Sequence, residues 1–367
     1  MTIIYFIIIL ALLILVHEIG HFVVAKASGM RVDEFGLGFP PRLMRLFKKG
    51  ETEYTLNLLP IGGFVKIFGE NYDNESDSGA QEHHSRSFTS KPRHKQALVL
   101  VAGVTFNMVF AWLLISVGFM IGLPAPVDFE AQGTVTNPEL MITAVSPDSP
   151  AEEAGLRPGD VITAVSSDTD VLEEGLTPKT VSWFIQTTPD RELAFSIKRG
   201  DNVLEERLEP VPGIIEEGRA VGVTMGMIGT LRLPVHQALW QGYRTTGELT
   251  SAVAVGISLF IYEAFTGAAD YSQVAGPVGI VGLVGDASVL GFVYLLQFTA
   301  LISINLAIIN LAPFPALDGG RLVMVAIESV KRSPINPKVA NGLNLVGFAL
   351  LILLMIAVTY NDILRLL

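Results

Sequence analysis

The sequence contains no cysteine, so disulfide bonds and thiolate metal ligands are excluded and the redox compartment cannot be inferred. Charged residues are also scarce. They make up 17% of the 367 residues, whereas a soluble protein of this length has about a quarter. Half of the residues are hydrophobic. The shortage of charge therefore indicates a protein with membrane spans.

Basic residues are in the minority, and the net charge is −11. The acidic excess is concentrated in residues 123–236, which contain 8 Lys or Arg against 19 Asp or Glu. Residues 26–95 are nearly balanced, with 11 Lys or Arg against 9 Asp or Glu. This distribution argues against a nucleic-acid partner, which would require a basic surface.

Four stretches contain no charged residue and reach the length of about 20 apolar residues that crosses a bilayer. They are residues 1–16 with an apolar continuation to Ala25, residues 96–127, residues 287–317 and residues 339–361. The first is not typical of a signal peptide, because it has no basic N-terminal region and no Ala-x-Ala site follows it. A fifth run, residues 249–262, is only 14 residues long and fits an interfacial or re-entrant helix better than a span.

Basic residues near the ends of spans mark the cytoplasmic side. They flank the end of the first span, the start of the second and the gap between the third and fourth, at Arg31, Arg42, Arg45, Lys48, Lys49, Arg86, Lys91, Arg93, Lys95, Arg321, Lys331, Arg332 and Lys338. This distribution of basic residues fits four spans, with both termini and the acidic segment on the extracytoplasmic side of the membrane. A crossing at 249–262 would break the parity unless another stretch, such as 274–292, also crossed.

The acidic segment has the pattern of a small α/β domain. Ser149-Pro150-Ala151-Glu152 predicts a capped helix start. Strands are expected at 141–145, 161–165, 192–198 and 203–208, and a second helix at 178–186. The order of strand, short helix, Gly-Leu-Arg-Pro-Gly-Asp and strand resembles a PDZ domain of the bacterial permuted type, with one copy in 135–228. Arg219–Val223 is a candidate for its peptide-binding edge, although an ordinary core strand is the simpler interpretation.

The first cytoplasmic loop contains a strand pattern. Residues 53–58 alternate with period two, Lys48-Lys49-Gly50-Glu51 predicts a turn before them, and 43–47 and 64–68 can supply further strands. We expect a β-hairpin or small sheet that dips toward the active site and pairs its 53–58 edge with an unwound substrate. The alternative is a hairpin that only braces the first helix. Residues 70–94 are polar and predict a flexible loop.

The first span contains His17-Glu18-Ile19-Gly20-His21. Residues i and i+4 share a helix face, so His17 and His21 can bind one metal ion. Glu18 lies beside them and can accept a proton from water at the metal, which is the chemistry of the H-E-x-x-H motif of zinc peptidases. A five-residue match can arise by chance, but ionisable residues within a spanning helix are rare and usually functional.

A catalytic zinc ion needs a third protein ligand and one open position. His83, His84, His94 and His236 lie outside the spans and are expected to be solvated surface histidines. Asp318 directly follows the third uncharged run and is the better candidate, with a helix-capping role as its alternative. No other histidine lies in a span.

His17-Glu18-x-x-His21, together with Asn310-Leu-Ala-Pro313-Phe-Pro315-Ala-Leu-Asp318-Gly319, resembles the site-2 protease family, and within it the RseP-type bacterial intramembrane zinc metalloproteases. The resemblance implies His17, His21 and Asp318 as zinc ligands, Glu18 as general base, and a role for Asn310 in holding the substrate or the transition-state oxygen. It also implies the bacterial inner membrane as the location, and single-span membrane proteins as substrates, such as anti-sigma factors or remnant signal peptides. The prolines at 313 and 315 are expected to interrupt the third helix near the zinc ion.

The sequence departs from the family in two ways. Only one PDZ-like unit fits, whereas some relatives carry two. The proline often found after the glycine in the second span is missing after Gly103, which leaves the role of Asn107 open between the active site and helix packing.

We therefore predict a polytopic α-helical membrane protein with four transmembrane helices, a membrane-associated β-hairpin and one extracytoplasmic PDZ-like α/β domain. In chain order, the predicted segments are 1–28 (first span with HExxH), 29–95 (cytoplasmic loop with the hairpin), 96–124 (second span), 135–228 (PDZ-like domain), 229–286 (interfacial or amphipathic helical segment), 287–330 (third span with the LDG motif) and 339–363 (fourth span). The predicted activity is zinc-dependent hydrolysis of peptide bonds in or near transmembrane segments. The alternatives are a non-catalytic zinc-binding adaptor that uses its PDZ domain, and a metal transporter.

Overall fold

The fold is a computed structural model that describes residues 2–70, 84–129, 133, 135–188, 192–200, 202–214, 218–268 and 275–366. The chain divides into two compact units. The first comprises residues 1–115, 242–285 and 297–367, and the second comprises residues 116–241 and 286–296. Most of the loop predicted at 70–94, including His83, lies outside the described residues.

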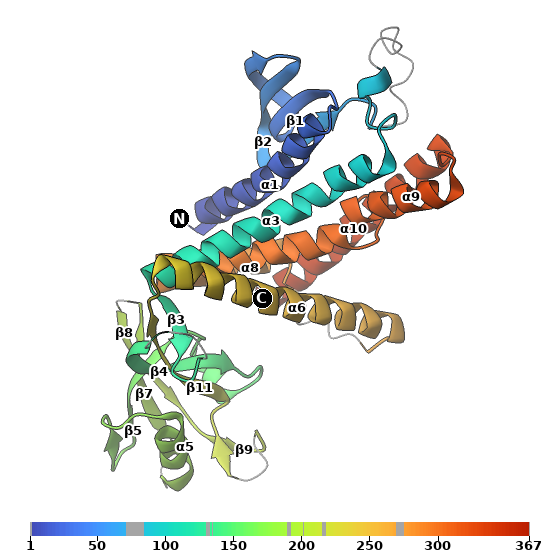
Figure 1. The fold of residues 1–367 in the computed structure, drawn as a ribbon. Coiled ribbons are helices and arrows are strands. Elements are labelled where there is room, and N and C mark those ends of the chain that lie inside the picture. The colour runs from blue at the N-terminus through green and yellow to red at the C-terminus, as the bar shows by residue number, and fades with distance from the viewer. Residues whose placement is uncertain are drawn as a thin grey trace. The chain divides into compact units, whose positions relative to one another are not determined.

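Seven long or medium helices dominate the described part of the chain (Figure 1). They are α1 (Thr2–Ala27), α3 (Arg93–Ile121), α6 (Val235–Thr266), α7 (Pro277–Leu290), α8 (Phe292–Leu311), α9 (Asp318–Lys331) and α10 (Pro337–Leu366). Within the described residues, five helices are long and apolar enough to cross a membrane, namely α1, α3, α6, α8 and α10. The chain is therefore a multi-pass membrane protein by length and composition of its helices.

Helix α6 differs from the prediction of a short interfacial segment at 249–262. That run is the C-terminal half of a 32-residue helix. The uncharged stretch was too short because Arg244 and Glu248 interrupt it, yet these two residues lie one turn apart and form an i,i+4 ion pair at 3.8 Å. Counting only uncharged residues thus underestimated the helix, which has the length of a candidate span.

The third hydrophobic run breaks where its prolines predicted. Helix α8 ends at Leu311, and α9 begins at Asp318 after a six-residue loop that contains Pro313 and Pro315. Proline lacks an N–H group and clashes with the preceding helical turn, so the chain cannot continue as one helix here. The run is also divided at its start, because Gly291 separates α7 from α8 with φ +115°.

Two long strands form the expected hairpin, β1 (Val32–Lys49) and β2 (Thr52–Ile67). Both strands bend, so that each pairs with its partner twice. Residues 53–56 pair with 34–37 on one side and with residues of 44–48 on the other, while 63–67 pair with 32–37. The resulting order of segments is 63–67, 32–37, 52–57 and 42–49.

The expectation that 53–58 forms the free edge is therefore wrong. Residues 53–56 lie inside the sheet, and three buried polar side chains attach segment 52–57 to β1. Thr52 donates to the carbonyl oxygen of Val32, Thr55 to Glu34, and Asn57 to the carbonyl oxygen of Gly38. Alternation along a single segment shows which side chains share a face, but it does not show how many neighbours the strand has.

The hairpin exposes six large apolar side chains between residues 43 and 59: Leu43, Met44, Leu46, Phe47, Leu58 and Leu59. Nearer α1, Phe47 stacks on Tyr54, and Tyr54 and Phe35 contact Phe22 of α1. The hairpin is thus anchored on the helix that contains the HExxH motif.

The second unit contains a sheet with the path β3-β11-β4-β5-β7-β8, with β6 paired to β5. Its strands are β3 (Leu123–Pro126), β4 (Val135–Val145), β5 (Val161–Ser166), β6 (Val171–Leu172), β7 (Leu193–Arg199), β8 (Asn202–Leu208) and β11 (Val223–Leu231), and β9 (Val211–Pro212) pairs separately with β10 (Arg219–Ala220). Two helices, α4 (Pro150–Glu153) and α5 (Pro178–Thr187), accompany them. The predicted strands at 141–145, 161–165, 192–198 and 203–208 and the helix at 178–186 are present, and Ser149 accepts a hydrogen bond from the Glu152 backbone as expected. The sequence did not predict β3, β6 or β9, and residues 219–223 divide between β10 and β11 instead of forming one strand. The sheet also extends beyond the predicted bounds of 135–228, from Leu123 to Leu231.

The Arg-Pro-Gly-Asp turn of this unit is closed by Asp160. Its buried carboxylate accepts hydrogen bonds from the backbone of Arg157 and from the guanidinium of Arg199, the latter at 2.7 Å. The hydrogen bonds to Asp160 raise the pKa of Arg199 above its ordinary value, so the guanidinium stays charged in this ion pair.

Candidate metal centre

The HExxH motif lies on the buried stripe of α1. Buried positions recur every four residues along this helix, at Ile9, Leu13, His17, His21 and Ala25. Gly20 permits close packing, because a Cβ atom there would lie 2.5 Å from the backbone oxygen of Ala102 in α3. The two histidines consequently face α3.

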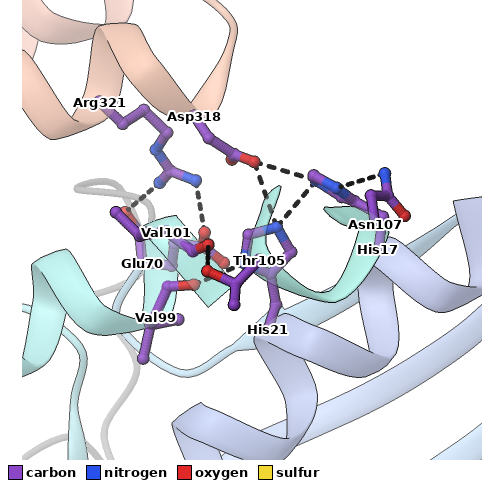
Figure 2. Close-up of polar contacts among 9 residues, drawn as sticks. All are labelled: His17, His21, Glu70, Val99, Val101, Thr105, Asn107, Asp318 and Arg321. Carbon is purple, nitrogen blue, oxygen red and sulfur yellow. Dashed lines mark hydrogen bonds and ion pairs between the residues drawn. The ribbon is translucent and has the colours of Figure 1, made fainter. Parts of the chain in front are cut away.

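His17, His21 and Asp318 converge (Figure 2). The Nε2 atoms of the histidines are 3.1 Å apart, and each lies close to Oδ2 of Asp318, at 3.0 Å for His17 and 3.2 Å for His21. Two residues from the first helix thus meet a residue 297 or more positions later.

The donor set and its spacing fit zinc. Tetrahedral Zn²⁺ with ligands at about 2.0–2.1 Å places neighbouring ligand atoms roughly 3.3 Å apart, close to the separations seen here. Two imidazoles and one carboxylate are also the ligand set of catalytic zinc sites that keep one position open. No other cluster of three such ligands occurs among the described residues.

The loop between α8 and α9 positions Asp318 as the first residue of α9. A side chain at Gly319 would collide with the backbone of Leu311 and Ala312, and one at Gly320 with the backbone of Phe314. Ala316 has φ +75°, which is unfavourable for a residue with a side chain, and its N–H donates to Asn344 of α10. Both glycines of Asp-Gly-Gly are therefore required for the loop to pack under the helix start.

The three candidate ligands border a cavity of about 640 Å³. Glu18 and Asn310, the predicted base and the predicted polar partner, line the same cavity. The carboxylate of Glu18 is hydrogen-bonded by the backbone of Val65, and its Cγ lies against Gly63. The 63–67 segment of the hairpin thus forms one wall of the cavity beside the candidate base.

The remaining histidines stay outside this cluster. His94 and His236 are exposed, in agreement with the prediction that they are surface residues. His83 and the side chain of His84 lie outside the part of the chain that the structure describes.

Sequence reasoning missed two features of the site. Arg321 donates to the carboxylate and the carbonyl oxygen of Glu70, and so joins α9 to the end of the hairpin (Figure 2). Val99 of α3 accepts a hydrogen bond from Nδ1 of His21 through its backbone oxygen at 2.8 Å. The Val99 contact uses a backbone oxygen, which any residue could supply, so the sequence gives no signal for it. In the sequence, Arg321 is one of many basic residues, and nothing there indicates that it contacts Glu70.

Comparison with known proteins agrees with this geometry. Residues 5–354 match the profile of Peptidase family M50. The chain belongs to Peptidase family M50. This confirms the resemblance to site-2 proteases and identifies the chain as a zinc metalloprotease. Its M50 relatives include a putative zinc metalloprotease of Clostridium perfringens, 36% identical over 99% of this chain and 98% of the relative. The regulator of sigma-W protease RasP of Bacillus subtilis is 29% identical over 100% of this chain and 99% of the relative, and a putative zinc metalloprotease of a Nostoc species is 32% identical over 94% and 91%.

Proposed function

We propose that this M50 protein hydrolyses peptide bonds within or beside the transmembrane segments of single-span proteins, with zinc held by His17, His21 and Asp318. The observation that supports this most strongly is the convergence of three zinc-type ligand atoms on one cavity that Glu18 also lines. Bound zinc would polarise the scissile carbonyl and lower the pKa of water to about 7.

The residues of the chain have distinct tasks in this reaction. Glu18 accepts a proton from the attacking water and delivers it to the leaving amine. Asn310 donates its amide N–H to the substrate or to the oxygen that develops charge. Val65 holds the carboxylate of Glu18 toward the cavity through its backbone N–H group. Membrane regulators of transcription are suitable substrates, since the Bacillus subtilis relative is named a regulator of sigma-W protease.

The substrate is expected to bind in extended form along the 63–67 segment. This segment pairs with 32–37 on one side only, among the residues that the structure describes, and its other side borders the cavity. An unwound substrate in a membrane must satisfy its backbone groups, because each orphan costs several kcal/mol in lipid. Strand addition supplies those bonds without strict dependence on side chains.

An ester scan of a substrate tests this pairing. Each backbone amide near the cleavage site is replaced in turn by an ester, which removes one N–H donor. Since N–H groups of an extended chain point alternately to either side, we expect a slower reaction at every second position, by at least roughly fivefold for a lost bond of about 1 kcal/mol. The intervening positions serve as controls. Equal cleavage rates at all positions would show that the substrate does not pair with the 63–67 segment, and the hairpin would then only brace the first helix.

The domain in 135–228 is proposed to be a PDZ-like filter on the outer side of the membrane. Among the described residues, β11 pairs with β3 only from Ile228 onward, and Met227 accepts a hydrogen bond from the backbone of Val127. Residues 223–226 therefore have no strand partner on that side, and α5 packs against β10 and β11. Such an edge beside a helix fits a peptide-binding groove.

Deletion of residues 135–228 is expected to relax selection and to preserve hydrolysis. The expected result is faster cleavage of a substrate that retains a large outer domain, because the steric barrier is gone, with an unchanged rate for a substrate already shortened to a short outer tail. Competition between the two substrates in one vesicle preparation measures the ratio. A deletion protein that folds, holds zinc and cleaves neither would disprove the filter.

We propose four crossings, by α1, α3, α8 and α10, with both termini outside in the bacterial inner membrane. If α6 also crossed, the chain would have to cross back before α8, and among the described residues only α7 lies between them. Helix α7 has 14 residues and is about 21 Å long, which is too short for the roughly 30 Å hydrocarbon core, so we do not count α6 as a crossing.

Single cysteines at three positions test this topology, because the parent has none. In intact spheroplasts, a membrane-impermeant maleimide should label Asp168→Cys and should leave Ser85→Cys and Ser333→Cys unlabelled until the membrane is opened. Labelling of Ser85→Cys from outside would reverse the proposed orientation.

Cleavage by the purified protein tests the function as a whole. A single-span substrate with a tag at each end is incubated with metal-stripped protein, with and without added zinc, and the products are mapped by mass spectrometry. We expect cleavage within or next to the span only when zinc is present. A zinc-binding adaptor would give no products, and a transporter would move zinc into vesicles without cleaving the substrate.

A further inference from the structure

Helix α3 presents three successive turns to the candidate zinc ligands. Val99, Gly103 and Asn107 are spaced by four residues and therefore share one helix face. The carbonyl oxygen of Val99 bonds Nδ1 of His21, and a Cβ atom at Gly103 would lie 2.5 Å from Nε2 of His21. At Asn107, Nδ2 lies 3.3 Å from Nδ1 of His17 (Figure 2).

Asn107 is buried without a complete set of partners. Its side chain is 0% exposed, and its Oδ1 has no hydrogen-bond partner among the described residues. A buried acceptor that lacks a hydrogen bond destabilises the fold, so this atom is available for a further partner. The residue itself is held firmly in place, because its backbone oxygen accepts a hydrogen bond from Ser303 of α8 at 2.8 Å.

The tautomer of His17 decides which amide atom should face it. Nε2 of His17 points to Asp318 and His21, so a metal ion held by these residues takes the lone pair of Nε2. The ring hydrogen then resides on Nδ1, which becomes a donor and needs an acceptor. A half-turn of the Asn107 amide exchanges its two terminal atoms and brings Oδ1 to this position.

We propose that Asn107 is a positioning residue for His17, which accepts the Nδ1–H bond through Oδ1 and fixes the ring with Nε2 toward the metal. This rests on the proposed zinc site. With this bond, the Nδ1 atom of each histidine would donate to an oxygen of α3, since Nδ1 of His21 already bonds the backbone oxygen of Val99. Loss of such a partner typically weakens metal affinity about 10–100-fold.

Three variants of the full-length protein distinguish a role of Asn107 as hydrogen-bond acceptor from a role in helix packing. Asn107→Leu preserves the approximate volume and removes all polar atoms, whereas Asn107→Asp preserves an acceptor and removes the donor. Asn305→Leu is the matched control, because it makes the same change on α8, where the Asn305 side chain donates to the backbone oxygen of Leu301 within its own helix. The zinc dissociation constant is measured by competition with a chelator, and the His17 Nδ1–H signal is followed by NMR of histidine-labelled, zinc-loaded protein.

We expect zinc affinity to fall about 10–100-fold in Asn107→Leu and to remain near the parental value in Asn107→Asp and Asn305→Leu. The Nδ1–H signal should persist in Asn107→Asp with a shifted frequency. Parental affinity in Asn107→Leu, or loss of affinity in Asn107→Asp, would overturn the proposal, and the aspartate variant decides alone if the leucine variant does not fold. A parent protein that binds no zinc through His17 would instead refute the metal site itself.

Discussion

Replacement of Glu18 by Gln should abolish peptide hydrolysis and leave zinc bound. Glu18 lines the cavity beside the three ligands but is not one of them, so the metal site stays intact while the proton acceptor is lost. General acid–base catalysis typically contributes 10²–10⁴-fold, and we expect a loss of that order in the cleavage rate. The measurement is single-turnover cleavage of a single-span substrate, with zinc content determined on the same sample.

A matched change provides the control for Glu18. Glu139→Gln removes one exposed carboxylate from the second unit and should leave both the zinc content and the cleavage rate unchanged. Cleavage by Glu18→Gln at the parental rate would show that another group accepts the proton, and loss of zinc in this variant would place Glu18 among the ligands.

Replacement of Gly103 by Ala is expected to remove zinc and activity together. The added methyl group would lie 2.5 Å from Nε2 of His21 and 2.6–2.7 Å from Cε1 and Nε2 of His17, beside the nitrogen atoms that would bind zinc. The histidines cannot retreat easily, because α1 packs on α3 at Gly20 and Ala102. Zinc affinity should fall by more than the roughly 10–100-fold that loss of an outer partner costs.

The direction of this effect is informative because alanine favours helices. In a helix interior, Gly→Ala normally stabilises by up to about 1 kcal/mol. Gly256→Ala in α6 is the control, since a Cβ atom there would have no neighbour within 4 Å. A Gly103→Ala protein that binds zinc as tightly as the parent would mean that α3 does not approach the histidines closely enough for a Cβ atom to lie 2.5 Å from His21.

The candidate ligands could be predicted from the sequence because each depends on strong, local signals. His17 and His21 could be paired because residues four positions apart share a helix face. Asp318 could be selected because it is the first charged residue after a long apolar run that ends with two prolines. The break between α8 and α9 was likewise determined by the covalent structure of proline. These features do not depend on knowing which helices are neighbours.

The sheet register and the outer contacts of the site could not be predicted. The hairpin strands pair twice because they bend at several bulges, and no periodicity reveals this. Helix α6 was underestimated because an ion pair compensates its charges locally. The contacts of Gly103 and Asn107 depend on the crossing of α1 and α3, which is a tertiary property, so the sequence left the role of Asn107 open.

X-ray absorption at the zinc edge tests the central claim most directly. Measured on zinc-loaded Glu18→Gln protein, it should show four light ligands at about 2.0–2.1 Å, including two imidazoles. The imidazole contribution should halve in His17→Ala, and the oxygen contribution should change in Asp318→Ala. A six-coordinate shell without imidazole, or a spectrum unaffected by either substitution, would contradict the proposed zinc site.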